Sequence, residues 1–152
     1  MGKSATYSGD LLKLALNGTP IANIADNAGT SPLTNLYVAL HTADPSTTAG
    51  PGTLGTATAS EVAYTGYARA AVARSSSSPA WTVTGTSASP VANINFPAST
   101  GGGSQTATFW SVSVASTGAS KILYSGPITP SSAIASGAQA PQLTTVSTIT
   151  EN

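Results

Sequence analysis

The sequence predicts an all-β protein, an antiparallel sandwich or jelly roll of about six to eight strands preceded by an amino-terminal arm with a short helix. From residue 33 onward, short apolar or alternating runs recur between segments rich in Gly, Pro and Ser, a pattern typical of strands joined by turns. A helical pattern occurs only before that point, and no period typical of a repeat protein is present. We therefore expect an arm over residues 1–32 and one β-sandwich domain over residues 33–152.

The arm combines a short helical segment with an ordered loop. Leu11–Leu16 is leucine-rich, with Asp10 at a start that the helix dipole favours and Asn17-Gly18 as a stop signal. The loop that follows, Thr19–Pro32, carries Asn, Asp and Gly at turn-like intervals. Arms of this kind often contact a neighbouring subunit. The residues predicted to make such a contact are Leu11, Leu12, Leu14, Leu16, Ile21 and Ile24.

Strands are expected where apolar side chains alternate or cluster. Leu36–Leu40 is a short apolar run that ends at the Asp44-Pro45 turn, which suits a central strand. In the segment after the Gly101–Gly103 loop, Trp110 and Val112 share one face. A turn over residues 117–120 then predicts a hairpin. The expected strands are Leu36–Leu40, Glu61–Arg74, Trp81–Thr84, Val91–Phe96, Thr106–Val114, Lys121–Tyr124 and Leu143–Thr150.

Charged residues are scarce: five are basic and five acidic among 152 residues, against roughly a quarter of the residues in an ordinary soluble domain. Such a surface suits a subunit packed into an assembly, because each buried unpaired charge is costly. A net charge of zero without a basic cluster argues against nucleic-acid binding. The absence of cysteine excludes disulfides and thiolate metal sites. No apolar stretch or leader pattern suggests a membrane span or export.

Residues for catalysis are few. His41 and Asp44 could hold a base and its orienting acid beside a serine, but the sequence has no Gly-x-Ser-x-Gly elbow. The favoured interpretation is that His41 closes a strand and Asp44 caps a turn. Isolated acids and one histidine suit neither a glycosidase pair nor a metal site, and the glycines at 101–103 lack the lysine of a phosphate loop. We therefore expect no enzyme, no cofactor and no metal.

Aromatic residues allow two interpretations. They could line a sugar-binding face, or they could fill the core or a subunit contact, which is the favoured interpretation. The residues concerned are Tyr64, Tyr67, Tyr124, Trp81 and Trp110.

Several blocks in order resemble one family. They are Leu36–Pro45, Glu61–Val72, Trp81–Val83, Asn93–Pro97 and Leu123–Gly126. Together they look like a family of small virion proteins of tailed bacteriophages, whose members are often labelled tail-fibre-like and some of which are similar to capsid decoration proteins. The resemblance extends from about Leu33 to Glu151. The residues that match its motifs are Tyr37, His41, Asp44, Pro45, Tyr64, Gly66, Tyr67, Arg69 and Trp81.

The resemblance implies a structural component of the virion, made in the host cytoplasm, and the scarcity of charge agrees with it. We expect a capsid decoration (cement) protein that binds the major capsid protein as a homo-oligomer, a trimer, with the arm as its contact. The alternative is a tail-fibre-associated or tail-tip subunit that contacts the host surface through loops at Ser46–Gly55 and Ala98–Ser104. A carbohydrate-active enzyme is disfavoured by the scarcity of acids.

Overall fold

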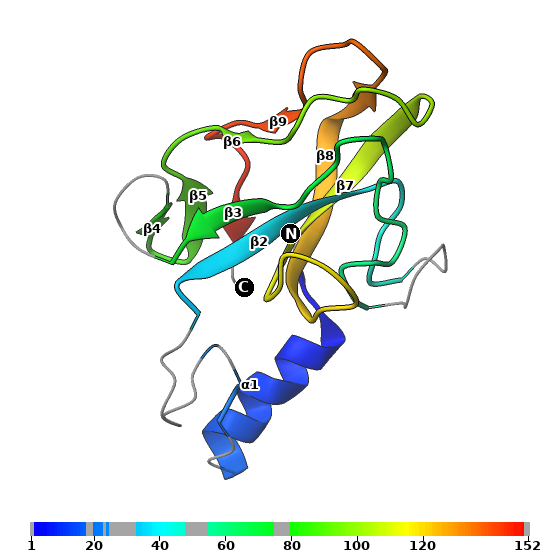
Figure 1. Cartoon of the computed structure of the whole chain (residues 1–152). Coiled ribbons are helices and arrows are strands. Elements are labelled where there is room, and N and C mark those ends of the chain that lie inside the picture. The colour runs from blue at the N-terminus through cyan, green and yellow to red at the C-terminus, as the bar shows by residue number, and fades with distance from the viewer. Residues whose placement is uncertain are drawn as a thin grey trace.

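The computed structural model describes residues 2–17, 20–22, 24, 33–47, 55–74 and 80–150. This part of the chain is mostly antiparallel β-structure with one amino-terminal helix, as predicted (Figure 1). It contains ten strands rather than six to eight, because several are only two residues long. The elements are β1 (Gly2–Lys3), α1 (Ala5–Asn17), β2 (Asn35–His41), β3 (Ala70–Ala73), β4 (Trp81–Thr84), β5 (Ser87–Pro90), β6 (Ile94–Asn95), β7 (Gln105–Ser113), β8 (Ile122–Ile134), β9 (Gln142–Leu143) and β10 (Ile149–Thr150).

The largest sheet has five antiparallel strands in the order β1-β8-β7-β2-β3. Leu40 lies opposite Trp110 and Val38 opposite Val112, so these four side chains share one face. This face is apolar because residues two apart in a strand point to the same side, and the positions that face the core hold Val38, Leu40, Trp110 and Val112. The β7–β8 hairpin confirms the prediction of a turn near residues 117–120.

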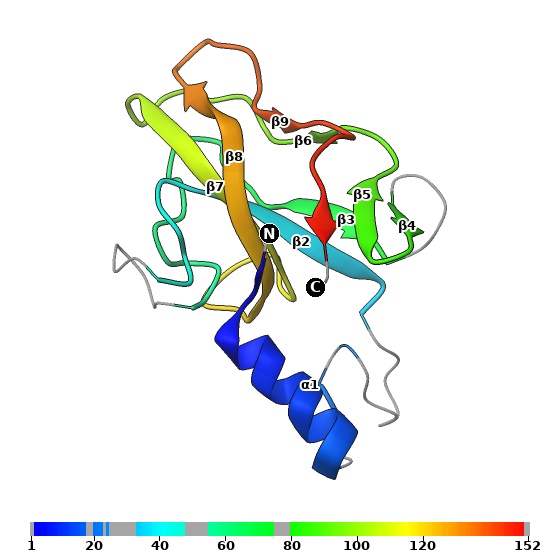
Figure 2. The same cartoon turned by 180° about the vertical axis from the view of Figure 1, so that it is seen from behind.

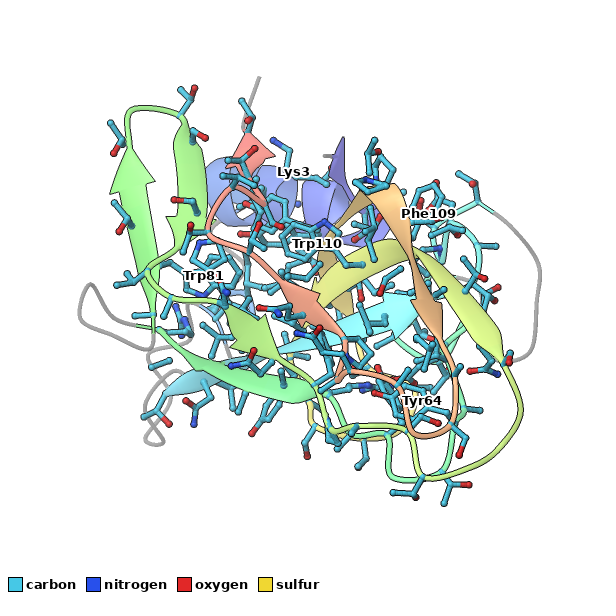
Figure 3. The ribbon with its side chains drawn as sticks, turned by 90° about the horizontal axis from the view of Figure 1, so that it is seen from above. Lys3, Tyr64, Trp81, Phe109 and Trp110 are labelled. Atoms are coloured by element: carbon cyan, nitrogen blue, oxygen red, sulfur yellow. The ribbon has the colours of Figure 1, made fainter. Side chains whose placement is uncertain are left out.

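Two smaller sheets contribute to the core on this apolar face. One has the order β10-β5-β4 and the other pairs β6 with β9 (Figure 2). Ile149, Ile94 and Leu143 from these sheets are buried in the same cluster as Leu40 and Trp110. Figure 3 shows Trp110 near the centre of the molecule and Phe109, its neighbour in β7, nearer the periphery. The arrangement is that of a sandwich with one large layer and one divided layer.

The contact between the arm and the β-domain begins closer to the amino terminus than the sequence suggested. Gly2 and Lys3 pair with β8, and α1 begins at Ala5, not near Leu11. Ser4 is the reason: its Oγ accepts a hydrogen bond from the Tyr7 amide (3.1 Å) and donates one to the Ile122 carbonyl (2.5 Å). This is an N-cap tied to the sheet. The prediction of a start at Asp10 was wrong because it followed the leucines and overlooked this cap.

Three strand predictions were too long. Only Ala70–Ala73 of the expected strand Glu61–Arg74 is regular, since Gly66 turns the chain with a φ of +95°. The expected strand Leu143–Thr150 is divided into β9 and β10 by a turn in which the Ser147 amide donates to the Thr144 carbonyl. The rest of Val91–Phe96 is likewise irregular around β6, although Ile94 and Phe96 are buried as expected.

One strand prediction was too short. β8 continues from Ile122 to Ile134 although it contains Pro127 and Pro130. Prolines are tolerated at a sheet edge because they lack the N–H that a second neighbour would need. β1 pairs only with Tyr124 and Ser125, so the later part of β8 has β7 as its neighbour within the described residues.

Candidate functional site

A buried polar cluster lies on the face of the large sheet opposite the apolar core. His41 of β2 and Ser111 of β7 are both completely buried there. His41 Nε2 lies 2.7 Å from Ser111 Oγ, and His41 Nδ1 lies 2.8 Å from the Ala59 carbonyl oxygen. Because a carbonyl only accepts, Nδ1 carries the proton and Nε2 accepts from the Ser111 hydroxyl. The segment that contains Ala59 thereby covers this face of the sheet.

The His41–Ser111 pair has the elements of a base and a nucleophile, but its surroundings do not suit catalysis. Both side chains are enclosed, so a substrate has no access to them in this structure. Asp44 does not orient His41: its Oδ1 accepts hydrogen bonds from the Ser46 amide (2.9 Å) and the Ser46 hydroxyl (2.7 Å). Asp44 therefore caps the turn at Pro45, and His41 closes the end of β2, as the favoured interpretation predicted.

The burial of His41 predicts a pH-dependent stability. Burial holds the pKa of His41 below its ordinary value of 6.5, although the Ala59 carbonyl opposes this. The unfolded chain then binds a proton at His41 more readily than the native chain does. The free energy of unfolding attributable to His41 should be constant above pH 6.5 and should fall as the pH drops through that value. Urea unfolding at pH 7.5 and pH 5.5 measures this, and His41→Gln should lose most of the difference; an equal pH dependence in the variant would contradict the assignment.

A buried ion pair fixes the end of the β7–β8 hairpin. Arg69 Nε lies 2.7 Å from Glu61 Oε1 and Arg69 Nη2 lies 2.8 Å from Glu61 Oε2, a bidentate geometry. The guanidinium also donates to the carbonyls of Ala115 (3.0 Å) and Gly118 (2.9 Å) and to Ser120 Oγ (3.1 Å). The Arg69 side chain is only 2% exposed. Arg69 was among the motif residues in the sequence, but its partners in the hairpin were not predictable from spacing.

The motif tyrosines support the strand β2 and the core beside it. Tyr67 accepts a hydrogen bond from the Leu40 amide (3.1 Å) and stacks on Phe96 with ring centroids 6.5 Å apart. Desolvation by burial, reinforced by Glu61, raises the pKa of Tyr67, so its hydroxyl stays protonated. Tyr64 is buried and donates to the Pro97 carbonyl (2.7 Å). These rings fill the interior and do not form an exposed platform for a sugar.

The remaining motif residues also have local structural contacts. The Tyr37 carbonyl accepts a hydrogen bond from Ser113 Oγ (3.1 Å). Pro45 is buried, and its carbonyl accepts from the Gly55 amide (2.8 Å). Trp81 packs against the core from β4. These contacts give the motif residues structural roles.

The predicted contact residues of the arm are placed in part. Ile21 is buried with Tyr7 and Leu123, and Leu11 and Ile24 pack against the same cluster. These three residues therefore attach the arm to its own β-domain. The side chains of Leu12, Leu14 and Leu16 lie outside the described residues, although their backbone belongs to α1. A contact of the arm with another subunit stays a prediction.

Of the two loops predicted to contact a host, one is described. Most of Ser46–Gly55 lies outside the described residues. Ala98–Ser104 is mainly exposed, and the Thr65 amide donates to the Gly101 carbonyl (2.9 Å) at its base. Gly102 has a φ of +92°, and a Cβ there would lie 2.9 Å from the Thr65 nitrogen. This loop is thus a built turn that only glycine suits, not a loose connection.

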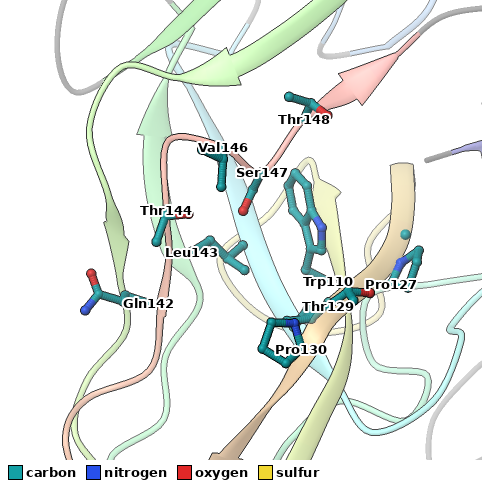
Figure 4. Close-up of a pocket in the computed structure, with 12 residues that line it drawn as sticks. Trp110, Pro127, Thr129, Pro130, Gln142, Leu143, Thr144, Val146, Ser147 and Thr148 are labelled. Carbon is teal, nitrogen blue, oxygen red and sulfur yellow. The ribbon is translucent and has the colours of Figure 1, made fainter.

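The described surface contains at least three hollows, one of them a small hollow of about 240 Å³ between β3 and β6. A second, of about 390 Å³, lies between β8 and residues 142–148 and is lined by uncharged residues that include Trp110, Pro130 and Thr144 (Figure 4). A third, of about 730 Å³, lies between the large sheet and the β4–β5 hairpin, and we name it the apolar groove. The apolar groove is defined by Leu36, Trp81, Val83, Ala88, Val112, Tyr124 and Ile149, with Arg74 and the β4–β5 turn at its margin.

The part of the chain that the structure describes contains no group of three or more His, Asp or Glu side chains placed to bind a metal ion. Its helix is too short and insufficiently apolar to cross a membrane.

Comparison with known proteins gives one family. Residues 4–150 match the family model described as "Podophage GP4 fiber I protein gp80". No curated protein matches the chain. The matched range includes the helix, the buried His41–Ser111 cluster and all but the first of the ten strands.

Proposed function

The chain belongs to the family of the podophage GP4 fiber I protein gp80, and from that membership we propose that it is a structural subunit of a podophage tail fibre. Membership of this family supports a virion structural protein of a tailed bacteriophage, as the sequence blocks suggested. The observation that carries the proposal is the extent of the match, which covers residues 4–150. A fibre protein family favours the tail alternative over the capsid decoration role that we expected first.

The distribution of charge supports a subunit that packs against other protein. Two ion pairs, Glu61–Arg69 and Asp10–Lys121, take up four of the ten charged residues within the fold. The described surface is left rich in Ser, Thr, Ala and Gly. Such a surface loses little hydration energy when a neighbour covers it, whereas unpaired charges would oppose contact.

The buried polar cluster and the Glu61–Arg69 ion pair support a structural role rather than a catalytic one. Their hydrogen bonds join strands and loops that are far apart in sequence: Ala59 to β2, β2 to β7, and Arg69 to the hairpin. We propose that the chain works without enzymatic chemistry, as a rigid scaffold for contacts made by its loops and edges.

Labelling of intact particles tests the location. An antibody raised against the purified chain and coupled to gold should mark the tail end of each particle in negative-stain micrographs. Pre-incubation of the antibody with the purified chain is the control and should remove the label. Gold distributed over the whole capsid surface would contradict the fibre proposal and would favour the capsid decoration role.

A further inference from the structure

The apolar groove is unfilled within the described part of the chain. Val83, on its rim, is 70% exposed although it is a large apolar residue. Trp81 Nε1 is buried and has no hydrogen-bond partner among the described residues. A buried donor without an acceptor is unfavourable, and exposed apolar surface favours association. A segment that binds in the groove should therefore supply apolar side chains to cover Val83 and a hydrogen-bond acceptor for the Trp81 indole N–H.

The helix α1 offers these properties. Its second half contains Leu12, Leu14 and Leu16 and a single charged residue, Lys13. The last four carbonyl oxygens of a helix have no intrahelical partner, and its C-terminal end carries a partial negative charge. No basic residue lies in the last turn of α1 to compensate this charge. The C-terminal half of α1 is thus leucine-rich, acceptor-rich and weakly negative at its end.

The groove has the complementary donors. Arg74 lies at its margin and brings a positive charge, and its guanidinium donates to the carbonyls of Leu33 (3.0 Å) and Ile24 (3.3 Å) while N–H groups remain for others. Trp81 adds the unpaired indole N–H. We propose that the C-terminal half of α1 from a second copy of the chain docks in the apolar groove.

The chain's own helix does not occupy the groove, because the helix is fixed in another direction, so the proposal takes the occupant from a second copy. β1 pairs with β8, Ser4 is bonded to Ile122, and Asp10 pairs with Lys121, so the first half of α1 is anchored to the end of the sheet. From there the helix projects away from the β-domain (Figures 1 and 2). A helix of one copy in the groove of the next is a heterologous contact, which builds a closed ring or a filament.

The exposed valines give a matched pair of variants. Val83 lies in the apolar groove at 70% exposure, and Val146 lies in the hollow between β8 and residues 142–148 at 81% exposure. Neither should be needed for folding. In sedimentation velocity of the full chain across a concentration series, the wild type should self-associate. Val83→Asp should raise the dissociation constant at least about tenfold, the equivalent of losing one buried valine contact. Val146→Asp should leave it unchanged.

Cross-linking tests the occupant directly. The chain has no cysteine, so Asn17→Cys and Val83→Cys can be made in separate copies, mixed and oxidised. A disulfide-linked pair is expected, and Asn17→Cys mixed with Val146→Cys should give none. A wild type that stays monomeric, an equal effect of the two aspartates, or equal cross-linking to both valine positions would overturn the proposal. The inference deepens the proposed function, yet it is measured in solution, so its failure leaves the location on the particle untouched.

Discussion

Replacing Arg69 with methionine should lower the free energy of unfolding by about 3–5 kcal/mol, the usual cost of removing one partner from a buried ion pair. The variant leaves the Glu61 carboxylate without its bidentate partner and leaves the carbonyls of Ala115 and Gly118 without a donor. Chemical denaturation followed by fluorescence measures the change.

Two further variants separate the buried pair from a general effect of charge. Arg74→Met removes an exposed guanidinium that also donates to backbone carbonyls, and it should cost less than about 1 kcal/mol. The double variant Glu61→Gln/Arg69→Met should lose less free energy of unfolding than the sum of the two single variants. The reason is that Glu61→Gln removes the carboxylate that Arg69→Met leaves without a partner. An Arg69 variant as stable as the Arg74 variant would contradict the role of this pair in holding the hairpin.

Replacing Leu40 with alanine should cost about 2–5 kcal/mol. Leu40 lies opposite Trp110 in the large sheet and is buried in the main core cluster. Its removal takes apolar contact from the central strand and leaves a cavity that the paired strands cannot readily close. Thermal and urea unfolding measure the effect.

Val146→Ala is the control for Leu40→Ala, because it also shortens an apolar side chain but at 81% exposure. It should change the free energy of unfolding by less than about 0.5 kcal/mol. If the two alanine variants were equally stable, the core would not be centred on β2 and β7.

The strands that could be predicted are those with a strong apolar signal. β2 contains a continuous apolar run, and β7 alternates Trp110 and Val112 with Ser111 and Ser113, so the positions of both strands follow from the sequence. β5, with the sequence Ser-Ala-Ser-Pro, carries no such signal and forms because β4 and β10 supply its hydrogen bonds. The start of α1 depends on Ser4 and its bond to Ile122, which is a tertiary contact.

For the site residues, too, local contacts could be predicted from the sequence and contacts between distant residues could not. Asp44 could be assigned to a turn because its partner is two residues away. The pairing of His41 with Ser111 depends on the register of β2 against β7, 70 residues apart in sequence. The bond from Arg69 to the Ala115 carbonyl likewise joins residues 46 apart. These contacts arise from the fold and leave no local pattern. The apolar groove likewise joins residues from β2, β4, β8 and β10.

The number of copies of this chain per purified particle, relative to the major capsid protein, tests the central claim most directly. Quantitative mass spectrometry with labelled reference peptides measures it. A fibre subunit should be present in far fewer copies than the capsid protein, because a podophage carries one tail with a limited set of fibres. A copy number close to that of the capsid protein would contradict the fibre role and would place the chain over the shell.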